Sequence, residues 1–155
     1  MSSTLFVDAI EPNLSSGVHI AGHVLQVVHG TTSTSVTHSD AFADTTLSAS
    51  ITPLSASSKI LILVVHHIYM NYRGGPIRLL RDATVVYNPI GYQTYFDTAG
   101  ISARLQTGFN YMDTPATTSS IIYKTQAKRY TSANSFITQE GGDTQATITL
   151  MEIAQ

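Results

Sequence analysis

Short runs of alternating apolar and polar residues, separated by turn-forming residues, dominate this chain of 155 residues. The clearest run is Leu47 to Ile51, in which Leu47, Ala49 and Ile51 alternate with two serines. A period of two places successive side chains on opposite faces of a β-strand, whereas a helix shows a period of 3.6 residues. No segment keeps the helical period, so the sequence predicts an all-β fold.

The expected strands are short, and turn signals recur about every 8–12 residues, as in an antiparallel sandwich. The strands are predicted at residues 4–10, 18–29, 47–51, 59–69, 77–80, 84–87, 101–111, 119–128, 135–138 and 145–153. Lys59 to Tyr69 (KILILVVHHIY) is apolar on both faces, which predicts a central strand buried on both sides. Ile101–Tyr111 and Ser119–Lys128 are expected to pair antiparallel. The predicted fold is an antiparallel β-sandwich of the jelly-roll kind with about eight to ten strands.

Length and turns predict one domain with a short N-terminal extension. Residues 1–16 are expected to form an N-terminal strand and attachment segment, which Glu11-Pro12-Asn13 ends, and residues 17–155 the sandwich. The apolar residues expected to make the attachment contacts are Leu5, Phe6, Val7 and Ile10.

Composition excludes several functional classes. The net charge of −2 and the scattered Lys and Arg residues provide no basic surface for nucleic acid. The longest apolar run, Ile60 to Val65, is far shorter than the ~20 residues that span a bilayer, and Met1 to Ile10 does not resemble a signal peptide. Cysteine is absent, so a disulfide or a thiolate metal site cannot form.

Catalytic signatures are also absent. The sequence has no G-x-S-x-G elbow, no H-E-x-x-H motif and no glycine-rich phosphate loop, so we expect neither an enzyme nor a cofactor. Five carboxylates fall in separate turns or strands, where we expect them to be solvated. These are Asp97, Asp113, Glu140, Asp143 and Glu152.

The six histidines are interpreted as structural. His19 and His23 lie four residues apart in an extended segment, roughly 13 Å apart on one strand face, which is too far to share a metal ion. His66 and His67 are adjacent and should point to opposite faces. One alternative remains: copies of His23 or His29 gathered around a threefold axis would form a metal site that no single chain contains.

Aromatic residues cluster in the loop after Pro89. Tyr92, Tyr95 and Phe96 lie within five residues of one another, and tyrosine combines a large contact area with a polar tip. The loop is a candidate contact for a saccharide or a partner protein. Packing against the sandwich or a neighbouring subunit is the alternative.

Several segments together resemble a known viral domain. They are Gly22–Val28 (GHVLQVV), Ser50–Leu63 (SITPLSASSKILIL), Arg78–Asp82 (RLLRD), Asp113-Thr114-Pro115 and Thr147–Ile153 (TITLMEI). In the same order, they are similar to a domain recurrent in tail-fibre and virion structural proteins of tailed marine and freshwater (including cyanobacterial) bacteriophages. The resemblance implies a homotrimeric jelly-roll head similar to tumour-necrosis-factor and complement globular domains, in which each subunit lends one sheet to the threefold interface.

The resemblance implies a non-enzymatic protein of the virion surface, made in the host cytoplasm, with other virion proteins as partners. In one hypothesis it is a tail-fibre tip or receptor-binding adhesin, whose loops at residues 30–44, 88–100 and 129–143 contact a host surface saccharide. In the alternative it is a capsid decoration protein that residues 1–16 attach to the major capsid protein. A jelly-roll carbohydrate enzyme would require two clustered carboxylates.

Overall fold

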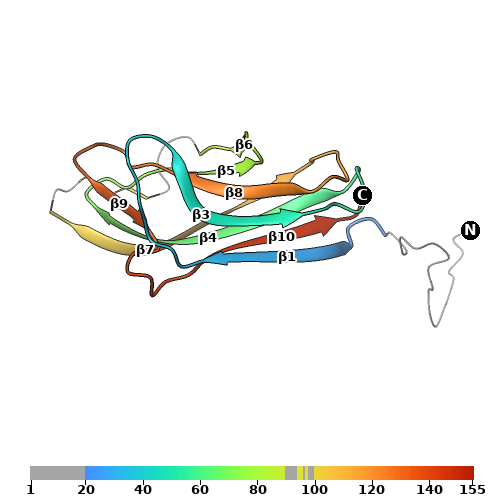
Figure 1. Cartoon of the computed structure of the whole chain (residues 1–155), viewed down its shortest axis with the longest axis horizontal. Coiled ribbons are helices and arrows are strands. Elements are labelled where there is room, and N and C mark those ends of the chain that lie inside the picture. The colour runs from blue at the N-terminus through green and yellow to red at the C-terminus, as the bar shows by residue number, and fades with distance from the viewer. Residues whose placement is uncertain (1–19, 90–93, 96, 98–99) are drawn as a thin grey trace, which may run out of the picture.

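The computed structural model describes residues 20–89, 94–95, 97 and 100–155. The described chain consists of strands and connecting loops (Figure 1). Within it, no helix is long and apolar enough to cross a membrane. The predicted attachment segment, with Leu5, Phe6, Val7 and Ile10, lies outside the described residues, as do Tyr92 and Phe96.

The described residues form ten strands, in agreement with the predicted eight to ten, and the strand predicted at residues 4–10 lies outside them. They are β1 (Val24–Thr32), β2 (Val36–Thr37), β3 (Ala43–Ile51), β4 (Lys59–Asn71), β5 (Ile77–Arg81), β6 (Thr84–Tyr87), β7 (Ser102–Asp113), β8 (Ile121–Ala127), β9 (Ser135–Thr138) and β10 (Ala146–Ile153). The strands form a larger sheet of β1, β2, β4, β7, β9 and β10 and a smaller sheet in the order β3-β8-β5-β6. All pairs are antiparallel, which confirms the predicted fold class.

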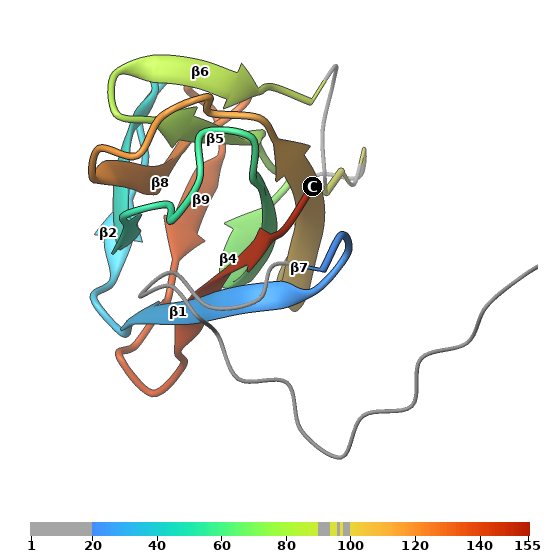
Figure 2. The ribbon, with the colours of Figure 1, turned by 90° about the vertical axis from the view of Figure 1, so that its right-hand side faces the viewer.

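The pairing is that of a jelly roll. Along one edge of β4, β10 pairs with residues 59–65 and β9 continues with residues 68–71, so β9 and β10 act as one interrupted strand. In the same way, β1 pairs with β10 and β2 pairs with β9 on the far side of this interrupted strand. The antiparallel pairs are then nested: β1 with β10, β3 with β8, β4 with β7 and β5 with β6. Figure 2 looks along the sandwich and shows the two sheets facing each other.

The core lies between the sheets because each strand buries alternate residues. On β3, Leu47 and Ile51 point inward, and on β4, Ile60 and Ile62 meet them. Each such side chain contributes roughly 1.5–3 kcal/mol when fully buried. A second cluster of buried residues, which includes Phe136 on β9 and Ile68 and Met70 on β4, fills the distal half of the sandwich.

The two ends of the sandwich differ in what they carry. At the proximal end, the amide of Gly22 donates to the carbonyl of Ala154 at 2.9 Å, which ties the turn before β1 to the chain after β10. At the distal end lie the loops of residues 38–42, 72–76 and 128–134, because Ala43 and Ile77 both pair with Ala127. Figure 1 shows the C-terminus at the proximal end and these loops at the other.

The prediction that residues 59–69 are buried on both sides is wrong. β4 is central in the larger sheet, but only one face meets the other sheet, and Leu63 on its outer face is 37% exposed. In a single chain, the core between the two sheets covers only one of the two apolar faces of β4.

The expected pairing of residues 101–111 with 119–128 is also wrong. β7 pairs with β4 along its whole length, whereas β8 lies in the other sheet between β3 and β5. The connection after Asp113 crosses from one sheet to the other, as nested pairing requires. The strand predicted from Val18 begins only at Val24, because residues 21–22 form a turn in which Gly22 has a φ of 85°.

Candidate functional site

The distal loops are hydrogen-bonded to one another and form one platform. The amide of Arg129 donates to the carbonyl of Ser39 at 2.9 Å, and the amide of Tyr130 donates to the carbonyl of Gly74 at 3.0 Å. Asn134 is buried, and its side-chain amide nitrogen donates to the carbonyls of Arg73 and Gly74. Three loops far apart in sequence therefore hold each other in place.

Arg73 is the centre of an aromatic cluster on this platform, which we call the distal cluster: Tyr72, Arg73, Tyr95, Asp97 and Tyr130. Arg73 Nη2 lies 3.0 Å from Asp97 Oδ1, and its guanidinium carbon lies 4.8 Å and 5.6 Å from the ring centroids of Tyr72 and Tyr130. The rings of Tyr95 and Tyr130 meet edge to face at 6.3 Å. Both rings remain partly exposed, so the cluster offers aromatic surface around a paired charge.

Two further observations mark the distal cluster. Tyr72 has a φ of 57°, a left-handed conformation that is costly for an aromatic residue and is concentrated at functional sites. The pKa of Tyr95 is raised, first by desolvation and then by its hydrogen bond to the Asp97 carboxylate. The hydroxyl of Tyr95 therefore stays protonated and donates its hydrogen to the Asp97 carboxylate.

Sequence reasoning found part of this cluster. It selected Tyr95, which the structure places in the cluster. It missed Tyr72, Arg73 and Tyr130, because these residues come from other loops. Arg73-Gly74-Gly75-Pro76 has the composition of a turn, but nothing in the sequence places it beside Tyr95.

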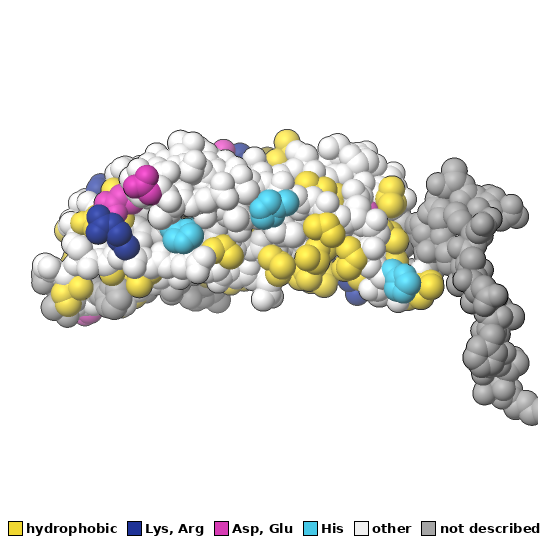
Figure 3. Space-filling model, turned by 90° about the horizontal axis from the view of Figure 1, so that it is seen from below, with side chains coloured by type: hydrophobic (Ala, Val, Ile, Leu, Met, Phe, Trp, Pro, Cys, Tyr) yellow, Lys and Arg dark blue, Asp and Glu magenta, His cyan; other side chains and the backbone are white. Residues whose placement is uncertain are grey.

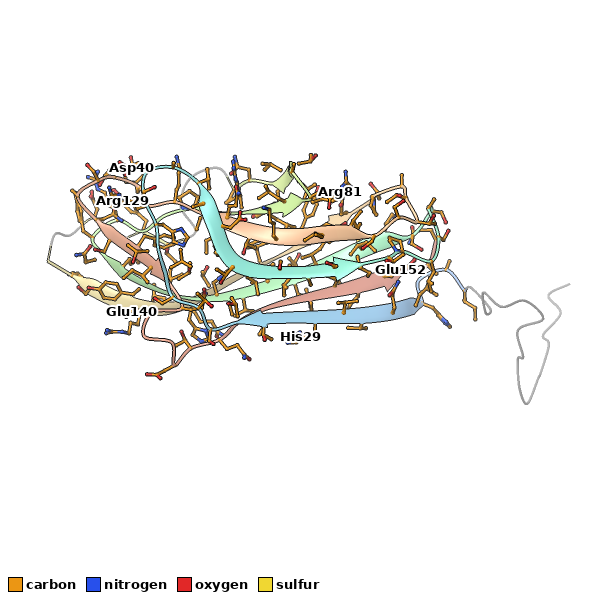
Figure 4. All side chains as sticks on the ribbon, in the orientation of Figure 1. His29, Asp40, Arg81, Arg129, Glu140 and Glu152 are labelled. Atoms are coloured by element: carbon orange, nitrogen blue, oxygen red, sulfur yellow. The ribbon has the colours of Figure 1, made fainter. Side chains whose placement is uncertain are left out.

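A second ion pair adds to the polarity of the distal end. Arg129 Nε lies 2.8 Å from Asp40 Oδ1, and Figure 4 shows the two residues together at the distal end. Arg73 and Arg129 each face an aspartate, whereas Lys128 of the same loops lies over the ring of Phe42, 5.1 Å from its centroid. Exposed ion pairs add only about 0–1 kcal/mol to folding.

The outer face of the larger sheet carries a second candidate surface. Four outward residues lie in one cross-strand row: Val27, Met151, Leu61 and Met112. Together with Leu63 of the next row they form what we call the apolar patch, in which Val27 is 56% and Met112 46% exposed. Figure 3, which views this face, shows hydrophobic side chains gathered on its proximal half and charged ones at its distal end. Contiguous apolar surface of this kind marks an interaction site.

The histidines lie in different environments. His66 is buried and His67 lies on the outer face, which confirms that they point to opposite sides of β4. His29 also lies on the outer face, where its Nδ1 is 2.9 Å from Thr149 Oγ1. His23 belongs to the turn before β1. In the part of the chain that the structure describes, no three His, Asp or Glu side chains gather as a metal site.

Two histidines are locked into a buried polar network between the sheets. His66 Nε2 lies 3.0 Å from Thr125 Oγ1, and the side-chain amide of Gln139 donates to His66 Nδ1 at 2.8 Å. His38 Nε2 lies 3.0 Å from Thr138 Oγ1. Burial lowers the pKa of His38 to about 4, and burial with the nearby His38 and His67 lowers that of His66 to about 3. Both rings are neutral at pH 7.

The expectation that all five singled-out carboxylates are solvated is wrong for two of them. Asp113 and Glu152 are buried, because each receives several hydrogen bonds that replace water. Asp97 and Glu140 are on the surface in ion pairs with arginines, and Asp143 is exposed in the turn before β10.

Comparison with known proteins does not identify the role of these surfaces. No protein family and no curated protein matches the sequence. Chains in solved structures of infectious bursal disease virus, Gt and Gx strains, are similar with TM-scores of 0.38 and 0.36 and sequence identities of 13% and 12%. Each comparison covers 97% of this chain but only 43% of the viral chain, so the chain spans less than half their length. The similar chains are viral, and the likeness concerns the β-sandwich alone.

Proposed function

We propose that this chain is a non-enzymatic surface protein of a tailed-phage virion, a homotrimer that binds a host surface saccharide through its distal loops. The observation that carries the proposal is the separation of the two ends. The chain before β1 and after β10 is joined at the proximal end, and the distal cluster lies at the opposite end. A protein anchored proximally presents the distal cluster outward.

The chemistry of the distal cluster supports a saccharide as its ligand. Sugars offer hydroxyl groups and one apolar ring face, which match hydrogen-bonding groups beside exposed aromatic rings. Tyr95 and Tyr130 supply the rings, and the paired Arg73 and Asp97 supply a donor and an acceptor without strong net charge. Hydrogen bonds between the loops hold this geometry before a ligand arrives, which reduces the entropic cost of binding.

The apolar patch supports the homotrimer. Leu61, Leu63 and Met151 lie at the centre of the larger sheet, where a soluble monomer would normally place polar residues. If each subunit contributes this face, three copies cover it around one axis. His29 lies in the row next to the most exposed patch residue, Val27, so the axis would also bring three copies of His29 closer together.

Attachment is assigned to the N-terminal segment. Residues 1–16, with Leu5, Phe6, Val7 and Ile10, precede the proximal end and would contact a tail protein or the major capsid protein. The alternative role of capsid decoration uses the same segment. The ion pairs of the distal loops support this alternative, because such pairs can stabilise the loops without any ligand.

Immunogold labelling of intact particles separates the two roles. Gold at fibre tips supports adhesion, and gold spread over the head supports decoration. The saccharide contact is tested by the double variant Tyr95→Ala with Tyr130→Ala in an adsorption assay on host cells. Retained adsorption with a normal melting temperature would remove the distal cluster from the binding site.

A further inference from the structure

We propose that the distal half of the outer sheet face holds a second ligand site, a pocket that takes one neutral pyranose ring. The pocket lies between β4, β7 and the turn of residues 139–145, away from the distal cluster. Its volume is about 150 Å³. The residues that line it are His67, Ile68, Arg104, Leu105, Gln106, Glu140 and Thr144.

The floor of the pocket is set by strand register. His67 on β4 lies opposite Gln106 on β7, and Tyr69 lies opposite Arg104, so all four side chains point outward from adjacent rows. The interruption between β9 and β10 raises the turn of residues 139–145 above this floor. Gly141 and Gly142 permit the turn because their φ values are 82° and 74°. The turn brings Glu140 and Thr144 to the rim.

Arg104 and Glu140 are held in a defined geometry. Arg104 Nε lies 2.7 Å from Glu140 Oε2, and the guanidinium carbon lies 5.2 Å from the ring centroid of Tyr69. The Tyr69 hydroxyl is in turn 3.2 Å from Ser102 Oγ. This ion pair engages only Nε and Oε2, so the Nη groups and Oε1 are available to donate to and accept from a ligand. The opposite charges cancel, which favours a neutral ligand over an ionic one.

His67 and Thr144 add two polar atoms to the pocket. His67 Nδ1 lies 3.1 Å from the carbonyl of Gln145, so this nitrogen carries the hydrogen and Nε2 is the acceptor of a neutral ring. Thr144 Oγ1 is buried and has no hydrogen-bond partner. An unpartnered buried hydroxyl costs about 1–3 kcal/mol, and a ligand hydroxyl would satisfy it.

The size of the pocket limits the ligand to one ring. A cavity of roughly 150 Å³ accommodates a single six-membered ring, whereas drug-sized ligands need about 300–1,000 Å³. The side chains of Ile68 and Leu105 face the core, so these residues line the floor through their backbone. The outward side chains of His67, Gln106, Arg104 and Glu140 surround this floor and suit the hydroxyl groups of a neutral pyranose.

The test is a ligand-observed and protein-observed NMR titration of the full chain in its own oligomeric state. The probes are the methyl pyranosides of glucose, galactose and mannose, with glucuronate as the charged comparison. We expect saturation transfer to at least one neutral pyranoside and a saturable shift of the His67 ring resonance. Glucuronate should bind more weakly.

Two matched variants on the same turn locate the site. Glu140→Gln removes the carboxylate from the rim, and we expect it to weaken binding by about tenfold or more. Asp143→Asn changes a carboxylate outside the pocket and should leave the affinity unchanged. Asp143 is exposed, and Glu140 is half-buried and loses one surface ion pair, so both melting temperatures should stay within about 4 °C of the wild-type value.

The outcomes separate this site from the distal cluster. If none of the three pyranosides gives a saturable shift of the His67 resonance, the proposal of a pyranose site in this pocket is wrong. The proposal is also wrong if Glu140→Gln leaves the binding intact. Loss of binding in the Tyr95 and Tyr130 double variant, but not in Glu140→Gln, would place the sugar at the distal cluster. In that case the proposed function stands and the second site does not.

Discussion

Tyr123 donates its phenolic hydrogen bond to Asp113 Oδ2 across 2.7 Å, inside the sandwich. Arg81 Nη1 reaches the same oxygen at 2.8 Å, so one buried carboxylate oxygen joins β5, β7 and β8. Because β7 belongs to the larger sheet and the other two strands to the smaller one, this contact ties the sheets together. Burial, followed by the hydrogen bond to Asp113, raises the pKa of Tyr123 and keeps its hydroxyl protonated.

Tyr123→Phe should therefore lower the free energy of unfolding by about 1.5–3 kcal/mol, the usual value for a hydrogen bond to a charged group. Tyr87→Phe is the matched control, because the Tyr87 ring keeps its stacking on Phe109 and the change should be within about 0.5 kcal/mol. Urea denaturation measures both. Equal stability of the two variants would show that the contact across the sheets contributes nothing.

The buried histidines predict a loss of stability in mild acid. The pKa values of His38 and His66 are about 4 and 3 in the folded chain, below the 6.5 of an unperturbed histidine. Below pH 6.5 the unfolded chain binds protons that the folded chain excludes, so stability is complete above that pH and falls as the pH is lowered. Each histidine contributes a slope of up to about 1.4 kcal/mol per pH unit.

The measurement is urea unfolding at intervals from pH 7 to 5, a window above the pKa of ordinary carboxylates. His66→Gln should reduce the slope by about half, whereas His29→Gln, on the outer face, should leave it unchanged. If the free energy of unfolding changes with pH at the same slope in the wild type and in His66→Gln, the low pKa of His66 is contradicted. The absolute stability of the variant does not affect this comparison.

Glu152 is predicted to anchor the loop between β3 and β4. Its Oε2 accepts a hydrogen bond from the Gln26 side chain at 2.6 Å, and its Oε1 accepts those of the Leu54 and Ser55 amides at 2.8 and 3.3 Å. Burial opposes ionisation, but these hydrogen bonds hold the pKa of Glu152 below its usual range. The folded chain therefore favours the carboxylate form.

Glu152→Gln should destabilise the chain by about 1–3 kcal/mol, because the new amide group faces donors instead of accepting from them. Glu140→Gln is the control, because it removes a single surface ion pair and should change stability by less than about 1 kcal/mol. Thermal unfolding at pH 7 compares them. If Glu152→Gln leaves the melting temperature unchanged, water must replace the lost hydrogen bonds.

The apolar patch is predicted to hold the subunits together. Leu63→Glu places a charge within the patch, where desolvation in an interface is unfavourable, so we expect the proposed homotrimer to dissociate. Ile122→Glu is the control, since Ile122 is similarly exposed but lies on β8 of the other sheet. Sedimentation velocity should give a monomer for the first variant and the native species for the second. A monomeric wild-type chain at micromolar concentration would refute the interface.

Local features of the fold were predictable from the chain. The alternation of Leu47, Ala49 and Ile51 identified a strand and its buried face, and the hairpin of residues 77–87 was found with both arms. These features depend on neighbouring residues, whose side-chain directions and φ values follow from the backbone geometry of a strand or a turn.

The candidate sites were predictable only in part. Tyr95 was selected because it lies near other aromatic residues in sequence, but its partners Arg73 and Tyr130 come from separate loops. The pocket at Arg104 and Glu140 has no sequence signature, because it forms where the interruption between β9 and β10 meets the β4–β7 register. Polar residues that converge from distant strands leave no pattern along the chain.

The sequence by itself determined that this protein is an all-β sandwich and where most of its strands lie. Only the tertiary structure decided that β7 pairs with β4 and not with β8, and that Asp113, Glu152 and His38 are buried. The physical reason is the range of the interactions involved. Alternation and turn geometry are set within a few residues, whereas strand partners and buried polar contacts depend on the sum of contacts between segments far apart in the chain.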